Sequence, residues 1–502
     1  MRRWLIGLAA ALLLAATGAH AQTLRIGLRE DPDILDPTLA RTFVGRIVFA
    51  GLCDKLFDID ESLAIVPQLA TGHAWSDDGR TLTIRLREGV VFHDGERLDA
   101  EAVKFSLERH LGMQGSFRRS EINAMEAVEV VDPATVRIRL RAPFAPFVSQ
   151  LADRAGMIVS PKAAREAGAN FGNRPVCAGP FRFVERVAQD RIVLERFAQY
   201  WNAAAIQVAR VEYRIIYDST VRLANLQSGA LEMAEITNPT DLPAIRRNPR
   251  LRATSVDELG YQSLTFNVAN GERARAPIGA DRRVREALEL AIDRATINQV
   301  VYSGEYTVGN QWMPPASPYH IASLAMPPRD VARARALLRE AGQPNPVVNL
   351  TVPNSPDLRQ VAEVIQAMAR EAGFDIRIQA MEFAASLQAA QRGEFEAYIL
   401  AWSGRVDPDG NLATFATCQG AQNDGRYCNA EVDRLVEEAR AVNDPAQRRA
   451  LYERAGRILL ADRPRIYLWH RRNIIAHVAN LQGFRPIADG LIRLHGVRLT
   501  GS

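Results

Sequence analysis

The sequence predicts an α/β protein divided into two or three lobes. At 502 residues, the chain exceeds the roughly 250–300 residues beyond which one hydrophobic core stops growing. Between residues 348 and 402, strand-like and helix-like segments follow one another in the order β-α-β-α-β, which is typical of a parallel sheet with right-handed crossovers. Residues 51–160 instead show cleanly alternating segments around one amphipathic helix, which predicts a smaller α+β lobe.

The first half of the chain supplies mostly strands. A helix over residues 100–110 follows a polar turn, with Asp99 as its N-cap, and a helix over 221–228 is closed by Gly229. Alternation of apolar and polar residues predicts strands at 23–28, 81–87, 135–141, 178–183, 190–196, 211–217 and 261–267.

The second half alternates between helices and strands. Apolar residues at helical spacing predict helices at 282–302, 358–368, 385–391, 432–441 and 446–460. Strands are predicted at 348–352, 375–380, 395–402, 465–470 and 473–479. We expect residues 267–280 to cross between lobes and the last two strands to return the chain across them.

The loop after the strand 395–402 gathers side chains suited to ligand binding. It contains Trp402, Arg405, Asp407 and Asp409 within eight positions. Ligands of α/β sheets bind outside the carboxyl ends of the strands, so this loop is predicted to form the floor of a ligand site. The same Asp-Pro-Asp-Gly-Asn run is also ordinary turn chemistry, and both interpretations stay open.

The balance of charge argues against a nucleic-acid partner. The chain has 62 basic and 58 acidic residues, a formal net charge of +4. Almost all the basic residues are arginines scattered beside acids, whereas nucleic-acid binding needs a basic stripe.

The N-terminus resembles an export signal. Arg2 and Arg3 precede the short apolar run 5–16, and Ala19-His20-Ala21 forms a small-residue cleavage site. Residues 1–21 are therefore expected to be a cleaved signal peptide. The residue directly after the cleavage site is Gln22 and not a cysteine that could carry a lipid, so we expect a soluble periplasmic protein.

Four cysteines are available for disulfides in an exported protein. Cys418 and Cys428 bracket a polar loop that a disulfide would close, and this pair is predicted. Cys53 with Cys177 is the remaining pairing, although connectivity cannot be deduced from spacing alone.

Motifs of common enzyme classes are absent from the sequence. There is no Gly-rich phosphate loop, His-Glu-x-x-His, Gly-x-Ser-x-Gly or zinc-type cysteine pair, so no catalytic residue, metal or cofactor is expected. Two rival classes remain: an exported hydrolase that uses His93, Asp407 or Asp409, and a receptor for a metal or metallophore.

Several short motifs, in order, resemble the family 5 extracellular solute-binding proteins, the peptide- and nickel-type periplasmic receptors of ABC importers. They are Phe-His-Asp-Gly at 92–95, Val-Lys-Phe-Ser at 103–106, Ala-Gly-Pro-Phe at 178–181, Leu-Glu-Arg at 194–196 with Tyr-Trp at 200–201, and Val-Arg-Glu-Ala-Leu at 284–288 with Ala-Ile-Asp-Arg at 291–294.

That resemblance implies a hinged two-lobe fold of the periplasmic-binding-protein type with an inserted α+β domain. Domain I (lobe 1) would comprise residues 22–50, 161–266 and 480–502, domain II residues 51–160, and domain III (lobe 2) residues 267–479. It also implies a monomer that closes on a small-molecule or peptide ligand and docks on an inner-membrane ABC permease.

The resemblance also points to an unusual ligand. In dipeptide-binding members, the residue three after this tryptophan is an aspartate that pairs with the peptide amino terminus, and here it is Arg405. An arginine that binds the peptide carboxylate is replaced by Val352. Because a guanidinium repels an ammonium and attracts a carboxylate or phosphate, we expect a ligand with an acidic or acceptor-rich group facing Arg405.

Five residues are candidates for contact with the ligand. Core packing is the alternative for the three aromatic side chains, and Asp407 either contacts the ligand or holds Arg405 in place. The candidates are Trp402, Arg405, Asp407, Trp312 and Tyr261.

Overall fold

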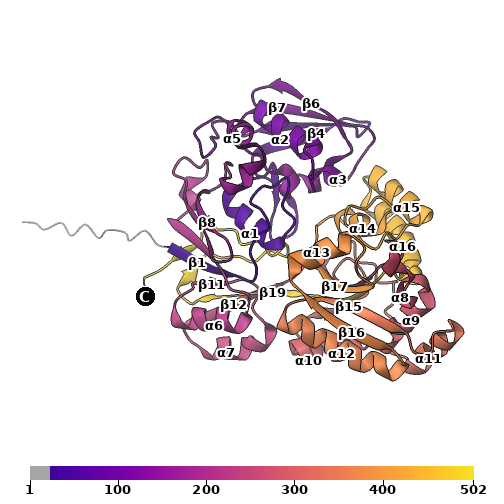
Figure 1. Cartoon of the computed structure of the whole chain (residues 1–502). Coiled ribbons are helices and arrows are strands. Elements are labelled where there is room, and N and C mark those ends of the chain that lie inside the picture. Colours follow the sequence, from indigo (N-terminus) through magenta and orange to yellow (C-terminus); the bar gives the residue numbers. More distant parts are fainter. Residues whose placement is uncertain (1–22, 502) are drawn as a thin grey trace, which may run out of the picture.

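The computed structural model describes residues 23–501 and shows two α/β lobes with a third domain at one end (Figure 1). Each lobe is built around its own mixed sheet, and domain II contains a separate antiparallel sheet. The expected two-lobe α/β architecture with an inserted α+β domain is therefore confirmed. The predicted signal peptide, residues 1–21, lies outside the described residues.

Lobe 1 contains, among the described residues, a seven-stranded sheet in the order β12-β19-β11-β1-β10-β9-β8. Helix α1 packs against it, and its apolar side chains join the largest core of the lobe. The elements are β1 (Thr23–Leu28), α1 (Phe43–Leu52), α5 (Pro161–Ala167), β8 (Phe181–Val187), β9 (Arg191–Arg196), β10 (Arg210–Ile215), α6 (Ser219–Ser228), β11 (Met233–Ala234), α7 (Leu242–Arg247), β12 (Leu251–Asp257), β19 (Arg472–Val478), β20 (Leu481–Gln482) and β21 (Arg498–Leu499).

Domain II is inserted between α1 and α5 of lobe 1. Helix α2 begins where Asp99 accepts a hydrogen bond from the amide of Ala102, as the sequence predicted. The elements are β2 (Phe57–Ile59), β3 (Ile65–Pro67), β4 (Ala70–Trp75), β5 (Thr81–Leu86), α2 (Ala100–Gly112), α3 (Arg119–Ile122), β6 (Met125–Asp132), β7 (Thr135–Leu140) and α4 (Phe147–Gln150).

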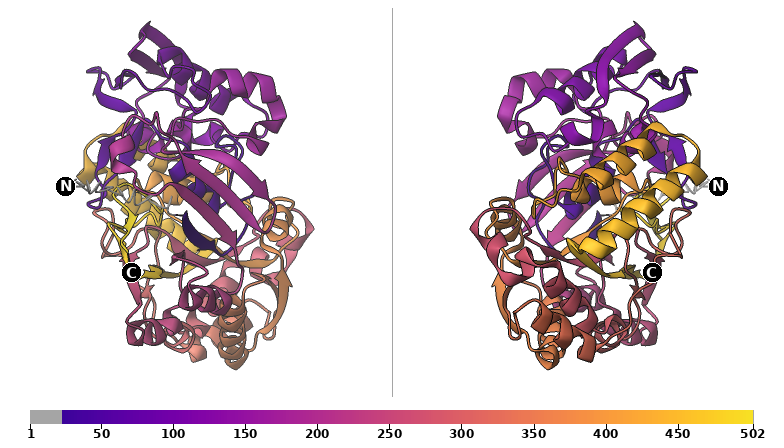
Figure 2. Two further views of the ribbon diagram at one scale, coloured as in Figure 1. Left: turned by 90° about the vertical axis from the view of Figure 1, so that its left-hand side faces the viewer. Right: turned by 90° about the vertical axis from the view of Figure 1, so that its right-hand side faces the viewer.

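Lobe 2 contains the sheet β14-β18-β13-β17-β15-β16 within the described part of the chain. Strand β15 pairs in parallel with both β16 and β17, which confirms the predicted β-α-β-α-β order. Helices α15 and α16 lie side by side on the surface of this lobe (Figure 2).

The elements of lobe 2 follow one another without long gaps except in the loop before α11. They are β13 (Tyr261–Phe266), α8 (Pro277–Ala280), α9 (Arg282–Ala291), α10 (Arg294–Tyr302), β14 (Thr307–Val308), α11 (Val331–Glu340), β15 (Val347–Pro353), α12 (Pro356–Ala372), β16 (Asp375–Met381), α13 (Phe383–Gln391), β17 (Ala397–Trp402), α14 (Asp409–Ala416), α15 (Ala430–Ala441), α16 (Pro445–Asp462) and β18 (Arg465–His470).

The chain crosses between the lobes at two places that differ from the sequence-based boundaries. Strand β13 was expected in lobe 1 but pairs with β17 and β18 of lobe 2, and β19 was expected in lobe 2 but pairs with β11 and β12 of lobe 1. The crossings are therefore the short links 258–260 and 471, and the segment 267–280 lies within lobe 2. Alternation identifies a strand but not the sheet that pairs with it.

Both expected cysteine pairs lie at bonding distance. The sulfur atoms are 1.98 Å apart in Cys53–Cys177 and 2.00 Å apart in Cys418–Cys428. The first pair joins the end of α1, where the chain leaves lobe 1 for domain II, to the segment before β8, where Cys177 pairs with Val159 of the chain returning from domain II. It therefore fastens the base of domain II to lobe 1.

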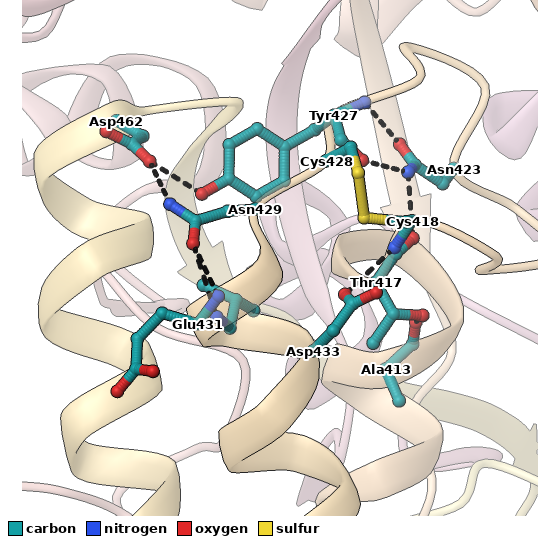
Figure 3. Close-up of a disulfide and its surroundings, with 11 residues drawn as sticks. Ala413, Thr417, Cys418, Asn423, Tyr427, Cys428, Asn429, Glu431, Asp433 and Asp462 are labelled. Carbon is teal, nitrogen blue, oxygen red and sulfur yellow. Dashed lines mark hydrogen bonds between the residues drawn. A yellow bond between two sulfur atoms is a disulfide. The ribbon is translucent and has the colours of Figure 1, made fainter.

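The second pair closes a loop between α14 and α15 (Figure 3). The amide of Cys418 donates to Asp433 on α15, and the hydroxyl of Tyr427 donates to Asp462 at the end of α16. These contacts hold the loop 418–428 against both helices. None of the helices between residues 23 and 501 has the length and apolar character that a membrane span requires.

Candidate ligand site between the lobes

The loop after β17 is shaped by one buried amide side chain. The Oδ1 atom of Asn411 accepts hydrogen bonds from the indole Nε1 of Trp402 at 2.9 Å and from the amide of Arg405 at 2.6 Å. Its Nδ2 atom donates to the carbonyl of Arg405 at 2.9 Å. Asn411 is fully buried on α14, so it fixes how Trp402 and Arg405 are presented.

Arg405 reaches from this loop to another domain. Its Nε atom lies 2.7 Å from Oδ2 of Asp153, and its guanidinium carbon lies 4.5 Å from the centre of the Trp402 ring. The side chain is 7% exposed. Asp153 precedes a short helical turn at 154–156 on domain II, so this ion pair bridges domain II and lobe 2.

Lobe 1 contributes to the same point through Arg46 on α1. Its Nη2 atom lies 3.1 Å from Oδ2 of Asp153 and its Nε donates to Oδ1 at 3.2 Å. Its Nη1 atom donates to Oγ of Ser403 at 3.2 Å. All three parts of the molecule therefore meet at one buried carboxylate.

Two further arginines on domain II complete what we call the interlobe arginine cluster, defined as Arg46, Arg118, Arg154 and Arg405 around Asp153. Arg118 forms an ion pair with Glu121 at 2.8 Å. Four guanidinium groups thus face two carboxylates, a net charge of +2.

Charge balance in the cluster is unusual for a buried site. Burial lowers the pKa of Arg405 to about 10 despite its contact with Asp153. Burial alone would raise the pKa of Asp153, but the positive charges of Arg405, Arg46 and Arg154 outweigh it and hold that pKa well below its ordinary value. The surrounding guanidinium groups therefore favour the ionised form of Asp153, and excess positive charge remains.

Two polar atoms of the cluster lack a hydrogen-bond partner among residues 23–501. They are the Nε atoms of Arg118 and Arg154, both in residues that are 2% exposed. Such atoms are costly to bury unsatisfied. An acceptor-rich ligand group would supply partners for the arginine Nε atoms.

Asp407 has a different role from either expected one. Its carboxylate accepts two hydrogen bonds of 2.8 Å from the buried guanidinium of Arg448 on α16. It therefore anchors the loop to α16, and the partner that holds Arg405 is Asp153. Sequence alone cannot show which carboxylate pairs with which arginine, because Arg405 and Arg448 are two among many arginines beside acidic residues.

Two of the aromatic candidates belong to the core of lobe 2. Trp312 and Tyr261 are fully buried in the same apolar cluster, and both rings contact Tyr467. The hydroxyl of Tyr261 donates to the carbonyl of Asn411. The structure thus favours the core-packing alternative for both residues, and Val352 is likewise buried in the lobe 2 core.

His93, the histidine considered for hydrolysis, is fully engaged in structure. Its Nε2 atom lies 3.1 Å from the carbonyl of Gly179, and its Nδ1 accepts from the amide of Cys177. Burial lowers its pKa to about 4. Among residues 23–501, no three His, Cys, Asp or Glu side chains are grouped so as to hold a metal ion.

Comparisons with known proteins agree on one family. The profile of the bacterial extracellular solute-binding proteins, family 5 Middle, matches residues 64–423. The glutathione-binding protein GsiB of Pectobacterium atrosepticum is 30% identical over 516 residues, covering 99% of this chain and 98% of its own.

Solved structures show the same fold. The periplasmic binding protein DppA of Helicobacter pylori, in complex with the peptide STSA, superposes with a TM-score of 0.87 at 24% identity, covering 95% of this chain and 98% of its own. AgaA of A. tumefaciens, in complex with agropinic acid, superposes with a TM-score of 0.87 at 24% identity, covering 96% and 99%. The chain belongs to the family 5 bacterial extracellular solute-binding proteins.

Proposed function

We propose that this protein captures a small peptide-like solute that carries more carboxylate than ammonium groups and delivers it to an ABC-type permease. The observation that carries this proposal is the net positive charge of the interlobe arginine cluster, buried where lobe 1, lobe 2 and domain II meet. The relatives named above bind glutathione, a peptide and agropinic acid, and each of these ligands carries a carboxylate.

Capture works by closure of the lobes. Within residues 23–501, the chain passes between the two sheets at the links 258–260 and 471 and nowhere else, so a small backbone rotation there can separate the lobes. Contacts across the gap include Arg405 with Asp153 and Arg46 with Ser403. A ligand carboxylate could accept hydrogen bonds from the guanidinium N–H groups that have no partner. Because these groups come together only when the lobes are closed, the ligand would bind the closed state more tightly and increase its population.

The cellular setting follows from the same proposal. Residues 1–21 would direct export and be removed after Ala21, leaving a monomeric periplasmic receptor held together by two disulfides. It would act without catalysis and without a nucleic-acid partner. A metal or metallophore is the less favoured ligand, because the cluster offers cationic rather than metal-binding side chains.

The binding test compares acidic and neutral ligands. We expect glutathione and agropinic acid to raise the melting temperature more than the neutral dipeptide Met-Leu, by mass action on the folded state. In calorimetry, Arg405→Gln should weaken the tightest ligand at least tenfold, since loss of one partner in a buried charge pair costs about 2–5 kcal/mol.

Arg434→Gln is the matched control, because Arg434 lies on the exposed side of α15 and forms its ion pairs with Glu431 and Glu438 of the same helix. It should leave affinity unchanged. Tight binding of Met-Leu that Arg405→Gln leaves undiminished would contradict the proposal.

A further inference from the structure

A solvent-open pocket of about 360 Å³ lies beside the links 258–260 and 471. Helix α7 and strand β12 of lobe 1 line it together with Arg472 at the start of β19, and lobe 2 contributes Glu305. Small-molecule pockets measure roughly 300–1,000 Å³ and often lie at domain interfaces. None of the lining residues belongs to the interlobe arginine cluster or to the loop after β17, so this is a separate candidate site.

The charged side chains of the pocket are mainly basic. Arg246 on α7, Arg252 on β12 and Arg472 supply three guanidinium groups, against the single carboxylate of Glu305. Among residues 23–501, neither Arg246 nor Arg252 has a carboxylate within 4.0 Å. The lining therefore has a net charge of +2, and the guanidinium groups favour an oxyanion as ligand.

The floor of the pocket is apolar. Leu242 and Ile245 on α7 and Leu251 on β12 line it and are at most 5% exposed. These side chains exclude water from one side of the pocket. A wall of low dielectric constant concentrates the field of nearby charges, so it strengthens the attraction between the arginines and an anion.

Arg472 is only loosely paired in this conformation. Its Nη1 atom donates to Oε2 of Glu305 at 3.4 Å, and its Nε atom lies 3.6 Å from Oδ1 of Asp257. The second distance is too long for a hydrogen bond, and Nε is buried without a partner among residues 23–501. Ionic hydrogen bonds are normally about 2.7–2.9 Å long, so an oxyanion in the pocket would supply Arg472 with a closer partner.

The position of Arg472 connects the pocket to the hinge. Arg472 directly follows the link at 471, Asp257 directly precedes the link 258–260, and Glu305 belongs to lobe 2. Rotation about the links therefore changes the distance between Arg472 and Glu305. An anion that takes the place of Glu305 on Arg472 repels that carboxylate, so it favours the hinge angles at which Glu305 has moved away.

We propose that this pocket binds a small dicarboxylate, which Arg246 and Arg252 hold together with Arg472 in place of Glu305. Two carboxylates match the net charge of the lining, and the pocket has room for the short carbon chain between them. The site is distinct from the one between the lobes. Because its occupancy depends on the hinge angle, the dicarboxylate and the captured solute change each other's affinity by the same factor.

Calorimetry with succinate and succinamate tests the pocket, because succinamate replaces one carboxylate with an amide of nearly the same shape. At constant ionic strength, which fixes charge screening, succinate should bind at least tenfold more tightly. Arg246→Gln and Arg472→Gln should each weaken succinate about fivefold, whereas Glu305→Gln should strengthen it by removing a repelling charge. Arg247→Gln is the matched control, because Arg247 is the exposed neighbour of Arg246 on α7 and lies outside the pocket; it should leave the affinity unchanged.

Two further measurements separate binding in this pocket from other effects. Arg246 forms no ion pair among the described residues, so ligand-free Arg246→Gln should melt at the same temperature as the wild type. Arg405→Gln should leave succinate binding unchanged, since a loss there would place succinate between the lobes and overturn the proposal. Absence of succinate binding, equally tight binding of succinamate, or an affinity that Arg246→Gln leaves undiminished would overturn it as well.

Discussion

Asp153→Asn should open the protein in solution. The substitution removes the carboxylate that pairs with both Arg46 and Arg405 and leaves like charges facing one another across the gap between the lobes. Breaking a buried ion pair by deleting one partner costs about 3–5 kcal/mol, which corresponds to a population change of more than about 100-fold. Small-angle scattering should therefore show a larger radius of gyration for the ligand-free variant.

Because the lost ion pair lies between the lobes, its free-energy cost should appear as opening of the lobes rather than as unfolding. When the lobes separate, water can reach Arg405 and Arg46 again, so the variant can escape much of the penalty without unfolding. We therefore expect a clear expansion with only a modest fall in melting temperature, and a circular dichroism spectrum close to that of the wild type.

Asp407→Asn is the matched control for Asp153→Asn. Asp407 and Arg448 form an equally buried ion pair, but both residues belong to lobe 2. Lobe opening cannot hydrate Arg448, so this variant should lose stability without expanding. An unchanged radius of gyration for Asp153→Asn, or an equal expansion in both variants, would contradict the role of Asp153 as a contact between lobes.

Local sequence signals predicted most of the secondary structure. The strand 23–28 matches β1, the helix after Asp99 begins where expected, and Gly229 ends α6 in a left-handed conformation. These features depend on residues that are close together in the chain, so the sequence alone can predict them. The β-α-β-α-β order likewise placed Trp402 and Arg405 at the end of an interior strand of lobe 2.

The partners of Arg405 could not be predicted in the same way. Arg46 and Asp153 lie hundreds of positions before it in the sequence, and neither belongs to a motif. With 62 basic and 58 acidic residues in the chain, the number of possible ion pairs is far too large for composition to select one. Only the docking of α1 and domain II against lobe 2 brings these three side chains together.

Contacts between distant parts of the chain also explain why Trp312 and Tyr261 were predicted to line the ligand site although they lie in the core. Trp312 lies in a proline-rich loop, which is normally exposed, and Tyr261 begins a strand near the hinge. Both rings are instead packed against Tyr467 on β18. Polarity patterns cannot show that a strand 150 or more residues later covers them.

Removal of the Cys53–Cys177 disulfide should cost more stability than removal of the other pair. The two bonds close 124 and 10 positions of chain, and the loop-entropy model assigns them about 5 and about 3 kcal/mol respectively. Both cysteines of a pair are replaced by alanine, so that no single free thiol remains. The two double variants are then compared by their midpoints of chemical denaturation under non-reducing conditions.

Position in the fold strengthens this difference. Both cysteines are buried, Cys53 where the chain leaves α1 for domain II and Cys177 beside Val159 of the returning chain, so their loss also loosens the contact between domain II and lobe 1. The loop 418–428 is held in addition by Asp433 and Asp462, which limits the loss there. An equal or larger shift for the Cys418→Ala/Cys428→Ala variant would contradict this ranking.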